Sequence, residues 1–523
     1  MSELHHECGI TALYVLDAPY HPGENGKGVD DIIIDENVVT LIPRILLDLQ
    51  SRGQLASGLT SYQGERAQIL KTFKDVGSVQ EVFRLSHPGP LQDILTEHAG
   101  SAAIGHTRYA TCGLDDVRYA QPFERVHGRL WKWFSFAFNG NLANYRELRD
   151  ALANQRYHFT LESDTEIILH ALTHSLRIDS PPALQHVMSE VSQVFDGAYN
   201  LVFLDAMHRM FVARDPLGFR PLSWAVQGRL FAAASESMAL MNLGFTDIHS
   251  LQPGQMAILE DGALRFARFA PCDRQARCFF EWIYFANLAS VIDDIPVHDV
   301  RNRLGQRLAE QEDQPLDNDC IVVPVPDTAR TTANAFACHL GLPYQEGIIR
   351  NRYVGRTFIQ PENIRGESAQ RKYTLIPSVL RGKRVFILED SIVRSTTLVA
   401  LVKQLRQIGQ AREVHIRVSC PPIVSPCFYG IDMSTRQELF APQFAPDGYA
   451  GIPDTEMQAA MARELGVDSL RYLSVPDIAA SLQTGVDTLC TGCVTGCYPT
   501  ACGQRLARET LLEPAEAGGR SYE

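Results

Sequence analysis

The sequence has no excess of positive charge, no long apolar run and no export signal. Its 48 lysines and arginines are outnumbered by 61 aspartates and glutamates, which gives a formal net charge of -13. Because phosphate backbones and anionic membranes attract a positive face, this balance argues against nucleic-acid and membrane partners. No run approaches about 18 apolar residues, and residues 1–9 lack a basic stretch followed by an apolar core. A cytoplasmic location is therefore expected.

Low-complexity tracts and a repeat period are also missing. Hydrophobic residues make up 45% of the chain and charged residues 21%, which are ordinary values for a globular protein. A chain of 523 residues is too long for one hydrophobic core, and the usual domain size predicts about two to four domains. We therefore expect more than one fold.

Twelve cysteines are present, but a disulfide framework is not expected in a reducing compartment. Most free cysteines are buried and have a packing role. Cys490 and Cys493 have the spacing of metal ligands, and they lie far along the chain from Cys278 and Cys427. By itself the pair is equally compatible with redox chemistry, zinc binding and chance.

The two halves of the chain differ in pattern. Residues 8–269 contain short β-rich runs separated by turn residues, which predicts a layered sheet domain with a few helices. One helix is expected at 164–176, with Ser163 as its N-cap. Residues 270–510 alternate buried apolar strands with helices, which predicts a parallel sheet with crossover helices. Gly341 and Gly409 stand where helix C-caps are expected, and the tail 511–523 is expected to be disordered.

A strongly β-favouring run at 385–388 leads directly into Glu389 and Asp390, then into a polar loop and a helix. In open α/β sheets, ligands bind beyond the carboxyl ends of strands, and a following helix offers free N–H groups to a phosphate. Ser395, Thr396 and Thr397 add hydroxyl donors. The adjacent acids suit ribose hydroxyls and a hard cation such as Mg²⁺. An isolated acidic pair would more often only end a strand and cap a helix.

Two further segments strengthen the phosphate interpretation. The run 321–325 ends in Asp327 and Thr328 before another helix, which gives a second turn compatible with phosphate. A glycine-containing loop at 350–357 carries three arginines, Arg350, Arg352 and Arg356, whose guanidinium forks match phosphate oxygens. The three segments together predict a site for a pyrophosphate-activated ribose phosphate.

Residues 385–397 resemble the phosphoribosylpyrophosphate-binding signature of type I phosphoribosyltransferases. More broadly, residues 278–439 resemble the amidophosphoribosyltransferase family, which catalyses the first committed step of purine synthesis, at 280–286, 352–361 and 426–432. The resemblance implies ammonia transfer from glutamine to 5-phosphoribosyl-1-pyrophosphate, giving 5-phosphoribosylamine, pyrophosphate and glutamate. It implies Mg²⁺ near Thr328, Glu389 and Asp390. The sugar-phosphate residues that it implies are Asp327, Arg352, Arg356, Glu389, Asp390, Ser391, Arg394, Ser395, Thr396 and Thr397.

Cys8 would ordinarily be assigned a packing role, but the motifs that follow it change this interpretation. The motifs, at 52–54, 105–109, 139–142 and 163–164, resemble the class II glutamine amidotransferase domain, an αββα sandwich of the N-terminal-nucleophile fold. The resemblance implies that residues 1–7 are a propeptide. After its removal, the α-amino group of Cys8, with a reference pKa of about 7.7 to 8.0, would act as the base for its thiol.

The same resemblance assigns the remaining glutaminase residues. It implies that the Asn139 side chain and the Gly140 N–H stabilise the oxyanion, that Arg108 binds the glutamine carboxylate and that Asp164 binds its amino group. Each residue also has an ordinary explanation. Asn139-Gly140 is a common hairpin turn, Arg108 would form a surface ion pair, and Asp164 would be an acidic charge at a helix N-terminus.

In one branch of the family, the equivalents of Cys278, Cys427, Cys490 and Cys493 bind a [4Fe-4S] cluster, and all four positions are cysteine here. Four thiolates suit an iron–sulfur cluster or a tetrahedral zinc, so the sequence leaves the metal open. The implied role is structural, tying the C-terminal segment to the transferase domain. Family habit further implies a homotetramer, feedback inhibition by purine nucleotides and an apolar passage for ammonia.

The sequence departs from the family pattern at several positions, including Thr328 and Ala329 where serine and glycine are usual. Glu389 stands where aspartate is usual, Leu55 where an acid is usual, and Ser395 where glycine is usual. Glycine in a phosphate loop often permits a positive φ, so Ser395 is expected to alter phosphate affinity. Two alternatives therefore stay open: a regulatory paralogue that binds phosphoribosylpyrophosphate or nucleotides without turnover, and a glutaminase that serves another acceptor.

Overall fold

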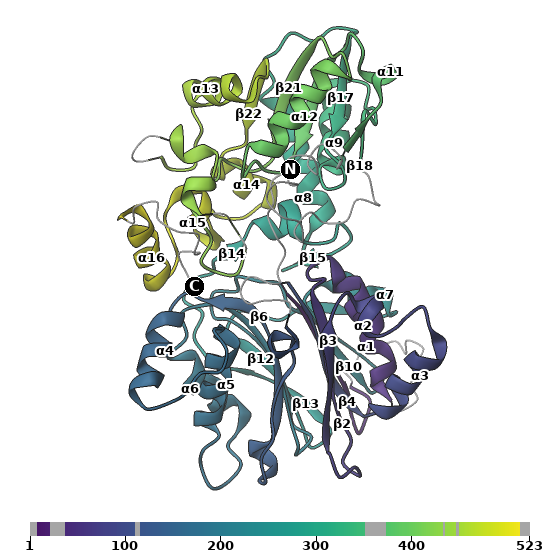
Figure 1. Ribbon diagram of the computed structural model, residues 1–523, viewed down its shortest axis with the longest axis vertical. Coiled ribbons are helices and arrows are strands. Elements are labelled where there is room, and N and C mark those ends of the chain that lie inside the picture. Colours follow the sequence, from purple (N-terminus) through teal and green to yellow (C-terminus); the bar gives the residue numbers. More distant parts are fainter. Residues whose placement is uncertain are drawn as a thin grey trace.

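The computed structural model describes residues 8–20, 37–109, 116–350, 373–431, 433, 435–445 and 449–512. The expected propeptide, Arg352 and Arg356 lie outside the described residues. Figure 1 shows two bodies: a lower one from the first half of the chain, in purple to teal, and an upper one in teal to yellow. The bodies correspond to the two patterns of the sequence.

The lower body contains two antiparallel sheets. In spatial order, the first sheet consists of β11 (Ile248–Ser250), β9 (Ser223–Gln227), β10 (Leu230–Ala234), β1 (Gly9–Val15), β4 (Ala102–Arg108), β2 (Ala56–Tyr62) and β3 (Leu70–Val76). The second consists of β13 (Ala263–Arg268), β12 (Gln255–Glu260), β8 (Met210–Arg214), β7 (Gly197–Asp205), β6 (Phe134–Leu142) and β5 (Phe123–Arg125).

Alternating residues of each strand explain the layers of this body. Ile10, Ala12 and Tyr14 of β1 pack between the sheets, whereas Leu13 points to the opposite face. That outer face is covered by α1 (Ile42–Asp48), α2 (Val79–Val82), α3 (Pro88–Glu97) and α7 (Ser237–Asn242). The second sheet is covered by α4 (Tyr145–Asn154), α5 (Asp164–Ser175) and α6 (Leu184–Ser192). The expected αββα sandwich is confirmed.

The upper body is built on a parallel sheet in the order β17 (Cys320–Pro324), β20 (Arg384–Glu389), β21 (Glu413–Val418) and β22 (Ser469–Tyr472). Phe386 and Leu388 face a core under α8 (Val297–Glu310), α9 (Arg330–Leu340) and α14 (Val475–Leu482). Val385 and Ile387 face the opposite core, under α11 (Pro377–Leu380), α12 (Thr396–Gln407) and α13 (Thr455–Leu465). The expected parallel sheet with crossover helices is confirmed.

The helix ends agree with the sequence at two of three positions. Ser163 caps α5 by accepting a hydrogen bond from the Glu166 N–H, as expected. Gly341 ends α9 with a left-handed φ of 68°, also as expected. The prediction that Gly409 is a C-cap was wrong. Ile408 is the C-cap of α12, and the residue with a positive φ in this turn is Gln410, at 52°.

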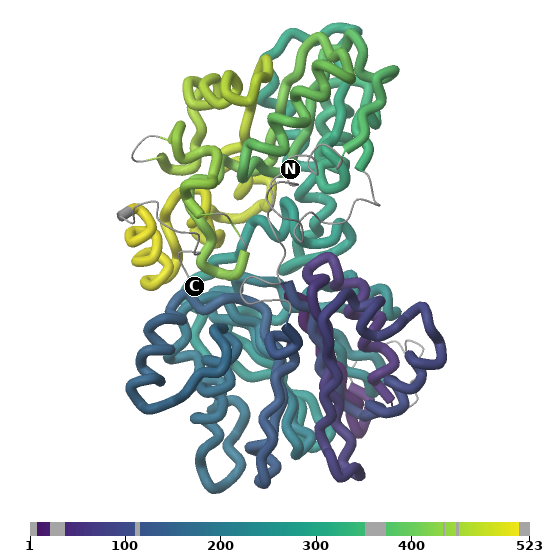
Figure 2. The backbone as a smooth tube through the Cα atoms, in the orientation of Figure 1, coloured from purple at the N-terminus to yellow at the C-terminus, as the bar shows by residue number. Residues whose placement is uncertain are grey.

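Short elements join the two bodies and hold the C-terminal segment. They are the pairs β14 (Arg277–Cys278) with β23 (Leu489–Cys490) and β15 (Val291–Ile292) with β16 (Ile295–Pro296), and the helices α15 (Gly492–Thr495) and α16 (Ala501–Leu512). A further short pair, β18 (Ile348–Arg350) with β19 (Tyr373–Leu375), packs within the upper body. In Figures 1 and 2 the yellow α16 lies beside the boundary, above α4. Arg505 of α16 forms an ion pair with Glu147 of α4.

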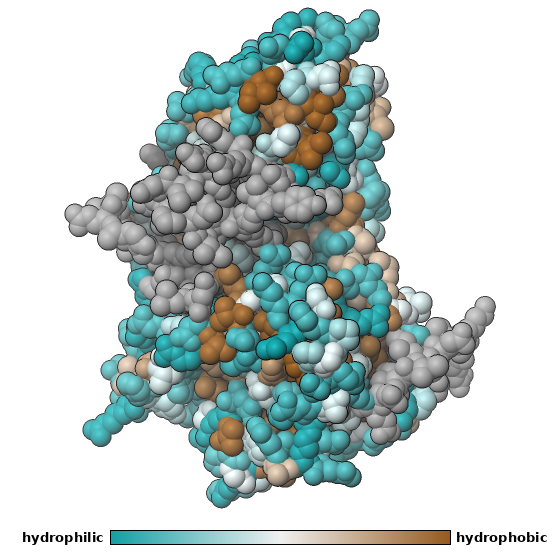
Figure 3. Space-filling model, turned by 45° about the vertical axis from the view of Figure 1, so that its right-hand side comes forward, coloured by the Kyte–Doolittle hydropathy of each residue, from teal (hydrophilic) through white to brown (hydrophobic). Residues whose placement is uncertain are grey.

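Among the residues coloured in Figure 3, hydrophilic ones predominate, and hydrophobic ones form groups near the upper end and in the lower half. Across the described ranges, we find no helix with the length and apolar character needed to cross a bilayer. The first two residues of the tail that was expected to be disordered, Leu511 and Leu512, form the end of α16.

Candidate functional site

Cys8 lies immediately before β1, beside the end of β4. Its Sγ lies 3.9 Å from the carbonyl oxygen of Tyr109, because β1 and β4 pair with Gly9 opposite Thr107. Burial raises the pKa of the Cys8 thiol to about 11, while Arg108 lowers it and Asp164 raises it. Both residues are therefore close enough to Cys8 to act on its charge. At neutral pH the thiol is protonated and needs a base before it can attack an amide.

The second sheet contributes Asn139 and Gly140 from β6. The buried Asn139 amide donates a hydrogen bond of 3.4 Å to the Ser235 hydroxyl, which also accepts the Ile10 N–H at 3.0 Å. Ser235 thus connects Asn139 to the strand that follows Cys8. Gly140 is required by close packing, since a Cβ there would lie 1.9 Å from the Ala198 carbonyl oxygen of β7.

Asp164 is the first residue of α5 and accepts hydrogen bonds from the backbone N–H groups of Leu142 and Thr165. Burial raises the pKa of Asp164 to about 6, so its carboxylate is ionised at neutral pH. Leu142 ends β6, so this bond ties the start of α5 to the strand that carries Asn139 and Gly140.

Arg108 ends β4 with a mostly buried side chain, and its guanidinium lies 5.3 Å from the centre of the Tyr119 ring. The loop that contains Arg52 and Gly53 packs directly on its backbone. A Cβ at Gly53 would lie 2.5 Å from the Arg108 carbonyl carbon, and the Leu55 N–H donates to the Arg108 oxygen at 3.0 Å. The absence of a side chain at Gly53 therefore allows this loop to position Arg108.

His106 belongs to the same motif as Arg108, but the structure gives it a structural role. Burial lowers the pKa of His106 to about 3, so the ring is neutral. Its Nε2 lies 3.3 Å from the Phe138 carbonyl oxygen, in the strand just before Asn139.

A buried ion network joins the two bodies. The Arg52 guanidinium lies 2.6 Å from Glu236 and 2.7 Å from Glu281, and all three side chains are almost fully buried. Glu281 begins a π-helical turn (Glu281–Phe285) of the upper body. Glu236 also accepts hydrogen bonds from the Asn287 N–H at 2.7 Å and the Ser290 hydroxyl at 2.8 Å. The Arg220 guanidinium also lies 3.7 Å from Glu281, so this buried network of charges helps to hold the bodies together.

The sugar-phosphate turn follows β20. Asp390 and Ser391 are buried, and the Ser391 hydroxyl donates to Asp390 Oδ1 at 2.8 Å. Asp390 Oδ2 is buried and has no hydrogen-bond partner among the described residues. Burial raises the pKa of Asp390 to about 6, against the lowering effect of Ser391 and Arg301. A buried carboxylate oxygen without a donor is the chemistry expected of a cation ligand.

The second predicted turn lies at the same edge of the sheet. β17 pairs with β20 with Pro324 opposite Leu388, which brings the turn after Pro324 beside Glu389 and Asp390. Asp327 lies 3.4 Å from Arg330 and 3.6 Å from Arg350. Thr328 is half-buried in this turn.

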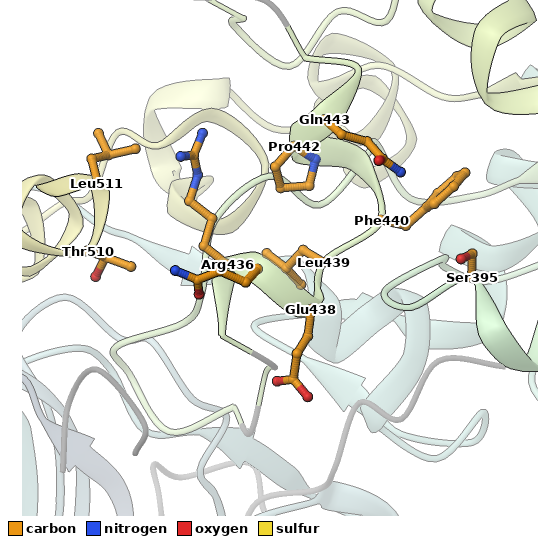
Figure 4. A pocket seen from close by; sticks show the side chains of 10 residues that line it. Ser395, Arg436, Glu438, Leu439, Phe440, Pro442, Gln443, Thr510 and Leu511 are labelled. Carbon is orange, nitrogen blue, oxygen red and sulfur yellow. The ribbon is translucent and has the colours of Figure 1, made fainter. Parts of the chain in front are cut away.

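The loop after Asp390 leads into α12. Ser395 caps this helix with φ -80° and ψ -17°, so the expected need for a positive φ is absent and serine causes no backbone strain. Thr396 and Thr397 begin the helix, and Arg394 forms an ion pair of 2.9 Å with Glu438. A pocket of about 530 Å³ extends from Ser395 past Arg436 and Phe440 to the end of α16 (Figure 4).

The four predicted cluster cysteines come together. Cys278 and Cys490 are register partners in β14 and β23, and they line one pocket with Cys427 and Cys493. Burial raises the pKa of Cys278 to about 11 and that of Cys490 further, and nearby cysteines add to both shifts. No three histidine, cysteine or acidic side chains of the described chain form a site for a single ion.

Comparisons with known proteins place this chain in one family. Residues 68–249 match the family model described as a glutamine amidotransferase domain. The chain is 36% identical over 502 residues to amidophosphoribosyltransferase of Methanothermobacter thermautotrophicus, covering 95% of this chain and 96% of that protein. It is 36% identical over 463 residues to the Bacillus subtilis enzyme, covering 87% and 90%. The chain belongs to the amidophosphoribosyltransferase family.

Solved structures agree with this membership. Glutamine phosphoribosylpyrophosphate amidotransferase from B. subtilis, complexed with ADP and GMP, matches with a TM-score of 0.78 and 33% identity, over 95% of this chain and 98% of that one. A structure described as the allosteric regulatory enzyme of purine biosynthesis matches with a TM-score of 0.79 and 34% identity, over 95% and 97%.

As an amidophosphoribosyltransferase, the protein transfers ammonia from glutamine to 5-phosphoribosyl-1-pyrophosphate in the first committed step of purine synthesis. The fold, enzyme class and reaction expected from the sequence are confirmed. Neither alternative, the non-catalytic paralogue nor the glutaminase with another acceptor, receives support.

Some residues of the amidophosphoribosyltransferase site were not identified from the sequence. Ser235 and Glu236 precede α7 in an unremarkable stretch, and their contacts with Asn139 and Arg52 depend on folding. Arg52 and Glu281 stand in recognised motifs, so a search for charged residues inside those motifs would have found them.

The buried network gives a stability prediction. Arg52→Met leaves Glu236 and Glu281 buried without this arginine, and breaking a buried ion pair from one side costs about 3–5 kcal/mol. We predict a loss of that size in the free energy of unfolding, measured by urea denaturation. The matched control is Arg129→Met, which removes the exposed ion pair with Asp179 and should change little. An equal effect of the two substitutions would contradict the assigned importance of the network.

Proposed function

We propose that the reaction is divided between two domains, residues 8–269 and 270–510. The first releases ammonia from glutamine, and the second presents the activated sugar. The proposal is supported by the grouping of Cys8, Arg108 and Asp164 at one site and by the buried Asp390 at the other. The single observation that carries the glutaminase half is the position of Cys8, because the charges of two predicted partners, Arg108 and Asp164, act on its thiol.

In the glutaminase step, the Cys8 sulfur attacks the side-chain carbonyl carbon of glutamine. Since burial keeps this thiol protonated, its proton must pass to a base, and the α-amino group exposed by loss of residues 1–7 would serve. The Asn139 amide and the Gly140 N–H stabilise the oxyanion of the tetrahedral intermediate. Collapse releases ammonia and leaves a thioester, which water hydrolyses to glutamate.

Charge complementarity orients the glutamine. Arg108 would bind the α-carboxylate through two parallel N–H donors, and the Asp164 carboxylate would bind the α-ammonium group. Asp164 supports this role because its pKa of about 6 leaves it ionised at neutral pH. Because both charges are close enough to act on Cys8, together they would hold the amide group at the sulfur.

In the second domain, Thr328, Glu389 and Asp390 would hold Mg²⁺, for which Asp390 Oδ2 supplies a fitting donor. When bound, the ion offsets the negative charge of the departing pyrophosphate. The residues proposed to bind the phosphates and ribose are Asp327, Arg352, Arg356, Glu389, Asp390, Ser391, Arg394, Ser395, Thr396 and Thr397. The helix N-terminus at Thr396 provides free N–H groups for a phosphate.

Ammonia would pass between the sites inside the protein. The buried aromatic turn that begins at Glu281 bonds to Arg52 of the first domain. Arg301 of α8 donates to the carbonyl oxygens of Trp282 and Ala286, and both Glu236 and Asp390 act on its charge. This apolar turn therefore occupies the region between the two sites.

The four cysteines would hold a [4Fe-4S] cluster. The four thiols line a common pocket, and in such a cluster each of the four irons takes one thiolate. A homotetramer, inhibition by purine nucleotides and a cytoplasmic location are further proposals, the second motivated by the ADP and GMP bound to the B. subtilis relative.

Two substitutions test the division of labour. Cys8→Ala should abolish product formation from glutamine yet preserve it with added ammonia, because the sugar site is intact. Asp390→Asn should abolish both, since the sugar would not be activated. Product would be followed as pyrophosphate release.

The proposed base is tested by the N-terminus of the wild-type protein, which intact-mass measurement should show to begin at Cys8. Full glutamine use by protein that retains residue 1 or 2 would contradict the proposed base.

The cysteine site is tested by its metal content. Anaerobically prepared protein should contain about four iron and four sulfide per chain, with visible absorption. Cys490→Ser should lose most of this content, because one ligand is missing. The control Cys338→Ser changes an exposed cysteine outside the pocket and should retain it. Colourless wild-type protein loaded with zinc would rule out the cluster.

A further inference from the structure

A segment of the second domain contacts the glutaminase strand directly. The Asn141 amide of β6 donates a hydrogen bond of 3.0 Å to the Phe428 carbonyl oxygen. Two residues further along this segment, a Cβ at Gly430 would lie 3.0 Å from the Gly140 carbonyl carbon and 3.1 Å from its oxygen. In Figure 1, β6 reaches the boundary between the two bodies. Gly430 therefore contacts Gly140, the residue that directly follows Asn139.

This segment is held firmly from behind. The Tyr429 carbonyl oxygen accepts a hydrogen bond of 2.6 Å from the buried Arg220 guanidinium, and its ring stacks on Phe219 with centroids 4.3 Å apart. The Tyr429 hydroxyl lies 3.0 Å from the Thr500 hydroxyl. Because both ends of Tyr429 are bonded, Gly430 cannot move away from Gly140 without breaking these contacts.

Gly140 is consequently confined on two sides. On one side, its Cα packs on the Ala198 carbonyl of β7, where a Cβ would approach to 1.9 Å. On the other side stands Gly430, with φ 98°, a conformation that favours glycine. The Cα and the carbonyl group of Gly140 are therefore fixed between a strand of its own domain and a turn of the other, which restricts rotation of the residue that carries the N–H.

We propose that Gly430, with the Asn141–Phe428 hydrogen bond, is a positioning element that sets the Gly140 N–H for the oxyanion of the glutaminase step. The inference rests on the proposed role of Asn139 and Gly140. Oxyanion donors act only when they are preorganised at the developing charge, and loss of one costs about 10²–10³ in kcat. The glutaminase site is thus completed by the second domain.

The test is Gly430→Ala in the full-length protein. Its methyl group pushes on the Gly140 peptide, so kcat for glutamine hydrolysis should fall by about tenfold or more. The KM for glutamine should change little, because Arg108 and Asp164 bind the ends of the substrate. Activity with ammonia should stay near the wild-type value. The control is Gly496→Ala, at φ 74° with no atom within 4 Å of the added Cβ, which should leave both activities unchanged.

Asn141→Ala provides an independent variant without backbone strain, and it decides the question if Gly430→Ala does not fold. Like Gly430→Ala, it should lower kcat for glutamine hydrolysis and preserve activity with ammonia. The positioning role is overturned if folded Gly430→Ala and Asn141→Ala proteins keep the wild-type kcat for glutamine. It is also overturned if these variants lose activity with glutamine and with ammonia to the same extent. Asn139→Ala distinguishes failure of the positioning role from failure of the oxyanion assignment. If only this variant loses glutaminase activity, the positioning role of Gly430 is wrong and the oxyanion assignment stands. If this variant keeps full activity, the oxyanion assignment is wrong.

Discussion

The buried contact of Arg52 with Glu236 and Glu281 is the constraint on which the arrangement of the two sites depends. Charges removed from water must be paired, so these side chains fix the relative position of the domains. Their chain neighbours are the positioning residues: Gly53 packs on the Arg108 backbone, and Ser235 bonds to Asn139. The interaction that joins the domains therefore also orders the glutaminase site.

Much of the fold followed from the sequence because its signals are local. Short β-rich runs separated by turn residues predicted a layered sheet domain, and strand–helix alternation predicted the parallel sheet. The αββα sandwich itself was implied by the resemblance to class II glutamine amidotransferases. The turn at Glu389 and Asp390 was predictable because ligands bind beyond the ends of parallel strands. Glu236 and Ser235 were missed since their partners lie far away along the chain, and no periodicity reports such contacts.

Ser395 shows the limit of reasoning from a single substitution. Glycine at this position often permits a positive φ, yet Ser395 has φ -80° and ψ -17°, a right-handed conformation that serine adopts without strain. The role of a glycine depends on its φ, which the residue type does not report, and the effect of Ser395 on phosphate affinity stays a prediction. At Gly140 and Gly430, by contrast, neighbouring backbone atoms require the missing side chain.

The central claim is that both sites form one unit in which ammonia passes internally from Cys8 to the sugar. It is tested most directly with glutamine labelled with ¹⁵N in its side-chain amide, in buffer that contains an excess of unlabelled ammonium. Mass analysis of the trapped phosphoribosylamine should show predominantly ¹⁵N, because released ammonia does not mix with the solvent pool. Product with the isotopic composition of the bulk ammonium would contradict the account.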